Sequence, residues 1–171
     1  PLDRLVRRFI YCFCSRIINK IIFLEKRLGT NTTYLMLNPF TVNTRDIMSI
    51  QNAARKIGDF IGLNDVKFIV IITAQQENVG GKIELIRGQK EVIIEVSKET
   101  VKYEAALLST LAHEITHKFL NEKGLSVGDG IIHQYENEIL TDIATVFLGL
   151  GKIMLNGCEC RREYEDRMGR T

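Results

Sequence analysis

Two stretches in the second half of the chain are apolar on nearly every side, yet each carries one polar stripe, and this feature constrains the fold most. Apolar residues recur at spacings of three and four over residues 101–122 and again over 134–155, which predicts two helices. A helix that is apolar all round is buried. Its polar side chains need partners there, because an unpaired buried polar group costs about 1–3 kcal/mol. We therefore expect the two polar stripes to meet a shared partner inside one core.

The first stripe holds two histidines four residues apart, with a glutamate directly after the first: His113, Glu114 and His117. Positions four apart lie on one helix face, so both imidazoles can bind one zinc ion at about 2.1 Å. Glu114 is rotated by roughly 100° from His113, which lets it reach a zinc-bound water rather than the metal. Zinc lowers the pKa of such a water to about 7, and Glu114 can accept its proton. The simpler alternative is two core histidines with ordinary hydrogen-bond partners.

The second stripe is acidic and contains Glu138, Thr141, Asp142 and Thr145. An acidic stripe on so apolar a helix is costly unless it meets a cation or hydrogen-bond donors. A catalytic zinc usually keeps three protein ligands, and Glu138 is our predicted third ligand. Asp142 then accepts a hydrogen bond from the second nitrogen of a ligating histidine. Two alternatives stay open: a solvated helix face without metal, and Glu136 as the third ligand, although it points about 200° away from Glu138.

The two motifs together resemble those of gluzincins, the zinc peptidase group that includes thermolysin. In that group a His-Glu-x-x-His helix is followed by a helix bearing Asn-Glu-x-x-Ser/Thr-Asp, and this chain has Asn137-Glu138-Ile-Leu-Thr141-Asp142. The resemblance covers about residues 67–155. It implies a Zn²⁺-dependent metallopeptidase with these roles: zinc ligands His113, His117 and Glu138, general base Glu114, and Asp142 and Asn137 behind the ligands, with Asp142 orienting His113.

The resemblance also implies a peptide or protein substrate that pairs with an edge strand near the zinc. The strand over 91–96 or its hairpin partner would serve. A peptidase further needs a hydrogen-bond donor near the developing negative charge. His133, Tyr135 and Tyr103 are candidates by residue type, and we prefer His133 because it directly precedes the predicted ligand helix.

The remaining pattern predicts an α+β fold, in which a small, largely antiparallel sheet packs on the zinc helix and the Glu138 helix crosses it. A helix is expected over 44–61, with Gly62 as its cap. Residues 67–73 are apolar on both faces, as in a central strand, and 82–86 and 91–96 form a hairpin. We divide the chain into a basic helix with its linker (1–42), a zincin-like catalytic domain (43–156) and a charged tail (157–171).

Composition narrows the partners and the compartment. The net charge of +2, with acids and bases mixed, favours no nucleic-acid partner. Residues 1–27 form a basic amphipathic helix, for which docking on its own domain is favoured over a membrane or partner contact. Four cysteines in two Cys-x-Cys pairs are expected to be reduced thiols, with a structural zinc site as an alternative. Together with the lack of a secretory signal, they predict a cytoplasmic location. The competing function is a non-catalytic regulatory or binding module that retains the zinc site.

Overall fold

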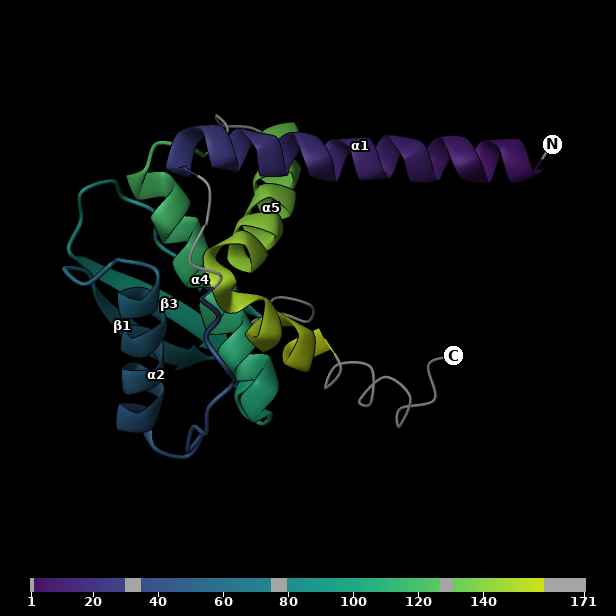
Figure 1. The fold of residues 1–171 in the computed structure, drawn as a ribbon. Helices are drawn as coiled ribbons and strands as arrows, with labels where there is room; N and C mark the ends of the chain where they lie inside the picture. Colours follow the sequence, from purple (N-terminus) through teal and green to yellow (C-terminus); the bar gives the residue numbers. More distant parts are fainter. Residues whose placement is uncertain (1, 30–34, 75–79, 127–130, 159–171) are drawn as a thin grey trace.

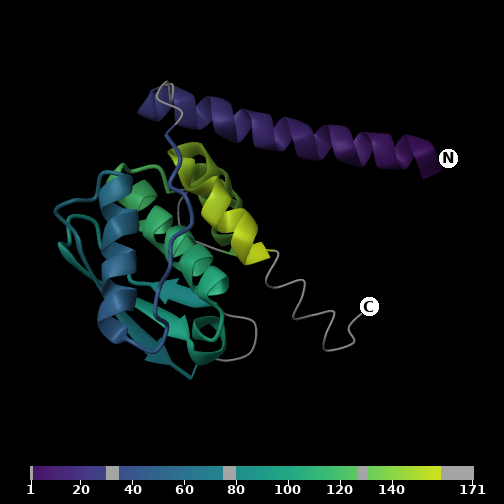
Figure 2. The same cartoon turned by 60° about the horizontal axis from the view of Figure 1, so that its bottom comes forward.

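The structure is a computed structural model that describes residues 2–29, 35–74, 80–126 and 131–158, with side chains from residue 14 onward except at 131 and 132. A three-stranded sheet is covered on one face by α2 and α4, and α5 packs on α4 from the other side (Figures 1 and 2). The predicted α+β class is confirmed. The elements are α1 (Leu2–Leu28), α2 (Ile47–Phe60), β1 (Lys67–Thr73), β2 (Gly81–Ile83), β3 (Glu91–Ser97), α3 (Lys98–Val101), α4 (Glu104–Glu122), α5 (Ile131–Thr145) and η1 (Val146–Leu150).

The sheet is mixed, with the strand order β1-β3-β2. β2 and β3 form the expected antiparallel hairpin, in which Gly81 pairs with Val96. The longer ladder, between β1 and β3, is parallel, so the prediction of a largely antiparallel sheet is wrong. The prediction that β1 is a central strand is also wrong, because β1 lies at an edge. Of the described helices, α2 and α4 cover one face of the sheet, and Ile71 on the opposite face of β1 is 39% exposed.

α4 lies at the centre of the core, in contact with the sheet, α2 and α5. The helix expected over 101–122 corresponds to α4, which begins three residues later, and a separate short helix, α3, precedes it. The hydroxyl of Ser97 caps α3 by accepting a hydrogen bond from the amide of Thr100 at 3.1 Å. α4 then begins after Tyr103, and its leucines and isoleucine fill the space between the sheet and α5. Its fully buried apolar residues are Leu107, Leu111, Ala112 and Ile115.

The helix expected over 134–155 begins earlier and is interrupted. α5 starts at Ile131, and the regular α-helical geometry gives way at Val146–Leu150 to a π-helical turn. Gly149 lies there with φ +90°, a conformation that favours glycine. A Cβ atom at this position would collide with the carbonyl oxygen of Leu35, and the amide of Leu37 donates to the Gly149 carbonyl at 3.0 Å. The break therefore lets residues 35–37 pass close against η1, and residues 151–158 continue as helix in a new direction (Figure 1).

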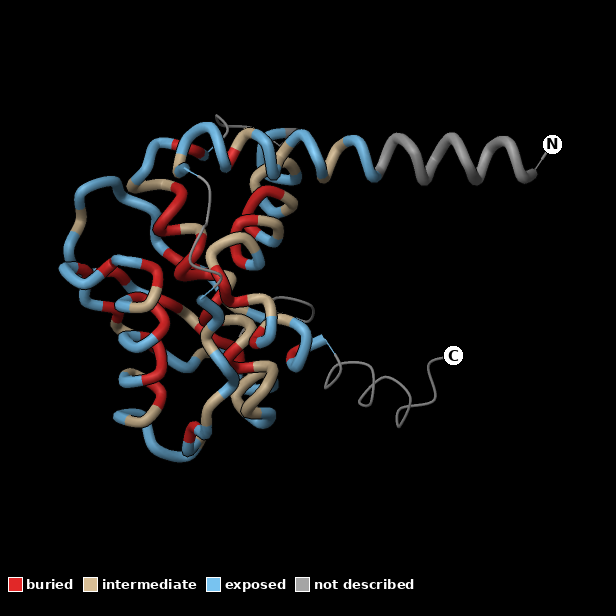
Figure 3. Tube along the Cα trace, in the orientation of Figure 1, coloured by how far each residue is buried: buried red, intermediate tan, exposed pale blue. Residues whose placement is uncertain are grey.

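α1 crosses α5, and its N-terminal half extends beyond the rest of the fold (Figure 1). Leu24 is fully buried in the core, whereas most other described residues of α1 are exposed or half-buried (Figure 3). The described half of α1 thus packs on its own domain. Among the residues that the structure covers, no helix combines the length and apolar character needed to cross a membrane. Of the predicted tail, Gly157 and Cys158 continue the last helix, and 159–171 lie outside the described residues.

Candidate metal centre

Two helices bring three ligand atoms together. His113 and His117 project from one face of α4, and Glu138 projects from the facing side of α5. The Nε2 atoms of the two histidines lie 3.0 Å apart. One carboxylate oxygen of Glu138 lies 3.0 Å from Nε2 of His113, and the other lies 3.3 Å from Nε2 of His117. Among the described residues, these three side chains form a group that can hold a metal ion.

The spacing of these atoms fits a tetrahedral metal site. Ligand atoms at about 2.1 Å from zinc, at tetrahedral angles, lie about 3.4 Å from one another. The two Nε2 atoms lie 3.0 Å apart, and each lies 3.0 or 3.3 Å from one of the two Glu138 oxygens, so the donor atoms are spaced about as closely as the ligands of one zinc ion. Two imidazoles and one carboxylate are also the ligand types of known catalytic zinc sites, which keep the fourth position open. The residues present therefore fit a divalent cation such as Zn²⁺ without rearrangement of the backbone.

Each histidine ring is held from behind by a residue of α5. Nδ1 of His113 lies 2.9 Å from Oδ1 of Asp142, and Nδ1 of His117 lies 3.0 Å from the hydroxyl of Thr141. An Nδ1–H that donates to these oxygens leaves Nε2 with its lone pair toward the metal position. Asp142 lies where the sequence motif predicts it. Sequence reasoning assigned no role to Thr141, although its place in the Asn-Glu-x-x-Thr-Asp motif was the signal.

The charges of the site are strongly coupled. Burial of the His113 ring opposes its charged form, but hydrogen bonds to Asp142 and Glu138 outweigh burial and raise the pKa of His113 to about 10. The hydrogen bonds from His113 and His117 hold the pKa of Glu138 far below its usual range. The carboxylates of Asp142 and Glu138 thus stabilise either a proton on His113 or a metal ion. Because a histidine binds a metal in its neutral form, metal binding must displace that proton.

Glu114 lies beside the ligands in a buried position on α4. Burial raises the pKa of its carboxyl group, and the nearby His113 and His117 oppose that rise. Gly81 on β2 makes the close contact possible, since a Cβ atom there would lie 3.1 Å from Oε1 of Glu114 and 2.5 Å from Cγ2 of Thr110. The carboxylate of Glu114 is therefore held between the metal position and the backbone of β2.

The metal site opens into a cleft between α4, α5, β2 and the last helical residues. β2 is the strand that borders it, because β3 is enclosed between β1 and β2 and offers no free edge. The far wall comes from Met154, Gly157 and Cys158, which sequence reasoning did not connect with the site. Their position depends on the change of direction at Gly149. The lining also includes Gly80, Lys82, Leu85, Ser109, Thr110, Gln134, Asn137 and Asp142.

Three other residues singled out in the sequence are not among the described residues that line the cleft. His133 belongs to the first turn of α5 rather than to a loop and is exposed. Tyr135 lies under the guanidinium of Arg16. Glu136, the alternative ligand, forms ion pairs with Arg16 and Lys20, and the hydrogen bond from Lys20 contributes most to lowering its pKa.

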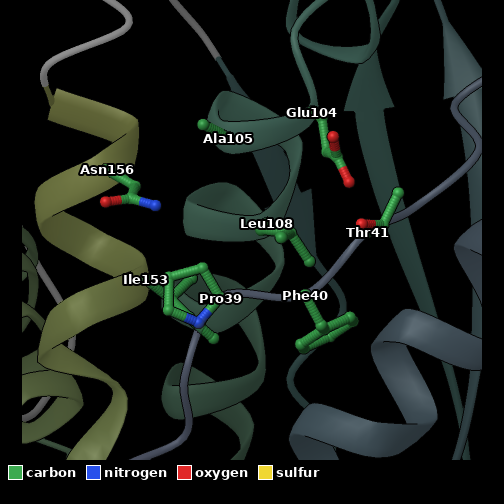
Figure 4. Close-up of a pocket in the computed structure, with 8 residues that line it drawn as sticks. All are labelled: Pro39, Phe40, Thr41, Glu104, Ala105, Leu108, Ile153 and Asn156. Atoms are coloured by element: carbon green, nitrogen blue, oxygen red, sulfur yellow. The ribbon is translucent and has the colours of Figure 1, made fainter.

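Two further candidate sites show no comparable cluster among the side chains that the structure describes. Of the two Cys-x-Cys pairs, Cys14 and Cys158 are described as exposed free thiols, and their neighbours lie outside the described side chains. A separate pocket lies between residues 39–41, α4 and the last helix (Figure 4). Its one titratable side chain is Glu104, whose carboxylate accepts a hydrogen bond from the amide of Val42. The centre at His113, His117 and Glu138 is therefore the candidate functional site.

Comparison of the chain with protein-family models, with curated proteins and with solved structures returned no match. The geometry of the site and its two sequence motifs are therefore the basis for inferring its function.

Proposed function

We propose that this protein is a zinc-dependent metallopeptidase with a gluzincin-like active site. One observation carries the proposal: ligand atoms of His113, His117 and Glu138 all lie within 4.8 Å of one another, beside the buried carboxylate of Glu114. A purely structural metal site has no use for such a base. The ligands His113, His117 and Glu138 leave one position for a water or a substrate carbonyl, as catalytic zinc sites do.

The side chains have separate tasks in peptide hydrolysis. Zinc, when bound, supplies Lewis-acid chemistry, which polarises the scissile carbonyl and acidifies the attacking water. Glu114 accepts a proton from that water and delivers it to the leaving amine. The raised pKa of Glu114 supports this role, because a carboxylate held in a buried site binds a proton more readily than an exposed one. Asp142 and Thr141 hold the two imidazole rings in the required orientation.

The substrate in this proposal is an extended peptide alongside β2. This strand is hydrogen-bonded to β3 on one side, and its other side borders the metal cleft. An edge strand can bind an extended segment through main-chain hydrogen bonds. Gly80 and Gly81 let β2 lie close against Thr110 and Glu114 of α4, so a peptide paired with this strand would lie beside the base.

The test combines metal analysis with a peptidase assay on Glu114→Gln. The wild-type protein should bind about one zinc per chain and cleave unstructured protein substrates. Glu114→Gln should keep the zinc and lose about 10²–10⁴-fold in rate, the usual contribution of a general base. Glu99→Gln, an exposed glutamate on α3, is the matched control and should change neither quantity.

Two outcomes would contradict the proposal. A wild-type protein that takes up no zinc when the metal is supplied would rule out the metal centre. If Glu114→Gln kept both its zinc and the full biological activity of the protein, Glu114 would not act as a base. The chain would then be a non-catalytic binding module with a metal site.

A further inference from the structure

The third ligand lies in the least packed part of the site. The side chain of Glu138 is 53% exposed, compared with 19% for His113 and 13% for His117. None of the described residues 133–138 is buried, and Leu140 is the first buried residue among the side chains of α5 that the structure describes. Core packing of these side chains therefore does not fix the position of residues 133–138, which leaves a role for another contact.

That contact is made by α1, which crosses α5 at this level (Figures 1 and 2). The carboxylate of Glu136 forms ion pairs with Arg16 and with Lys20, whose Nζ lies 2.7 Å from Oε2. Lys20 also donates to the main-chain carbonyl of Glu136 at 3.4 Å. The guanidinium of Arg16 lies 5.4 Å from the ring centre of Tyr135. The side chain of Lys20 is only 14% exposed, so its charge is partly shielded from water.

The two contacts of α5 lie on opposite sides of the helix. Residues two apart on a helix differ by about 200° in direction, so Glu136 and Glu138 point away from each other. Glu138 is directed to the histidines of α4, and Glu136 is directed to α1. The ion pairs on one side therefore set the position from which the ligand on the other side reaches the metal.

We infer that Arg16 and Lys20 are positioning residues for the metal centre, through which α1 holds the first turns of α5 and keeps Glu138 in ligand geometry. The inference rests on the proposed metal site and extends it, because it assigns to an N-terminal helix outside the two motifs a part in metal affinity. α1 then sets how tightly the site holds zinc without contributing a ligand of its own.

The experiment measures the Zn²⁺ dissociation constant of the full chain by competition with a chromogenic chelator. Glu136→Lys reverses the charge that pairs with Arg16 and Lys20 of α1. We expect zinc binding to weaken about tenfold, which is near the lower limit for the loss of a residue that orients a metal ligand. Lys20→Met is the milder variant and should weaken binding about threefold, which keeps the test informative if the charge reversal disturbs folding. Amide hydrogen exchange of residues 134–138 should accelerate in both variants.

A charge swap provides the rescue. In the double variant Lys20→Glu with Glu136→Lys, the new glutamate lies between Arg16, four residues earlier on α1, and the new lysine on α5. Zinc affinity should return to within about threefold of wild type. Because the lysine at position 136 remains, this recovery cannot come from removal of its repulsion toward the metal. Glu91→Lys, at an exposed pair with Lys67 on the sheet, carries the same charge change and should leave zinc affinity unaltered.

The outcomes separate this inference from the proposed function. If the wild-type protein binds zinc and both Glu136→Lys and Lys20→Met bind it equally well, α1 has no positioning role and the metal centre still stands. A weakened single variant that the charge swap does not recover would also overturn the inference. If the wild-type protein binds no zinc at all, both proposals fail together.

Discussion

The two helices that carry the ligands are stabilised in different ways. α4 runs through the middle of the core, and Leu111 and Ile115 on it are fully buried. Even Lys118 has no exposed side chain, because its ammonium donates to the carbonyl of Ile86 at 2.6 Å and pairs with Glu122. The first turns of α5 have no buried residue among 133–138 and depend on polar contacts with α1 and with the histidines.

The histidine ligands and the glutamate ligand should therefore differ in how rigidly they are held. Close-packed side chains of a core sit in defined positions, so His113 and His117 are preorganised by α4. A helix held by half-exposed ion pairs is adjustable, because such pairs contribute only about 0–1 kcal/mol each. The metal centre thus combines a rigid pair of donors with one adjustable donor, and changes in the two helices should have separable effects.

Removal of a ligand should have the largest effect and should not distinguish the helices. His117→Ala and Glu138→Ala each leave two protein ligands. We expect zinc affinity to fall by more than the roughly 10–100-fold that follows loss of a residue hydrogen-bonded to a ligand. Elemental analysis after dialysis measures this directly. Full retention of zinc by Glu138→Ala would show that α5 supplies no ligand. The contrast between a rigid and an adjustable ligand helix would then no longer apply.

A methyl group on Gly81 should impair catalysis without weakening the metal site. Its Cβ would lie 2.5 Å from Cγ2 of Thr110 and 3.1 Å from Oε1 of Glu114, so β2 or the base must shift. Small displacements of a catalytic group cost up to about 10²-fold, and we expect kcat/KM of Gly81→Ala to fall about 10–100-fold. Zinc content should stay at the wild-type value. A parallel loss of zinc would show that the strand supports the ligands and not only Glu114.

Thr141→Val tests how the orientation of His117, one of the two rigidly held ligands on α4, affects metal binding. The substitution keeps the shape of a buried side chain but removes the oxygen that lies 3.0 Å from Nδ1 of His117. The ring then loses the partner that orients it, and zinc affinity should fall about 10–100-fold. Chelator competition gives the value, and thermal unfolding reports whether the fold is retained. Unchanged affinity would mean that packing on α4 alone orients His117.

Lys118→Met should lower the stability of the fold while leaving zinc affinity nearly unchanged. The substitution leaves the carbonyl of Ile86 without its donor and the Glu122 carboxylate without its cation. We expect the free energy of unfolding to fall by about 1–3 kcal/mol, as measured by urea denaturation. Zinc affinity of the folded protein should change least of all, because α4 remains packed on both sides. If this variant weakened zinc as much as Glu136→Lys does, global stability rather than the α1 contact would control the metal site.

Local sequence pattern by itself determined the helices, the hairpin and the ligand motifs. A spacing of four residues puts His113 and His117 on one helix face wherever the helix lies in the fold. The same argument links Glu138 with Asp142 on α5, and the burial of α4 follows from its apolar composition, whereas residues 133–138 of α5 are not buried although the apolar composition of that helix predicts burial. These inferences depend only on residues within about two turns of each other, which is the range over which backbone geometry is fixed.

Contacts between distant segments were decided only by the tertiary structure. The parallel pairing of β1 with β3 makes β2 the edge strand, and no alternation within a strand indicates its neighbours. The turn at Gly149 brings Met154 and Cys158 to the cleft, and the crossing of α1 brings Lys20 to Glu136. Each of these joins residues that are far apart in the chain, and their meeting depends on how whole elements pack. Periodicity shows which face of an element is buried, but the element that covers that face is chosen by the packing of the entire core.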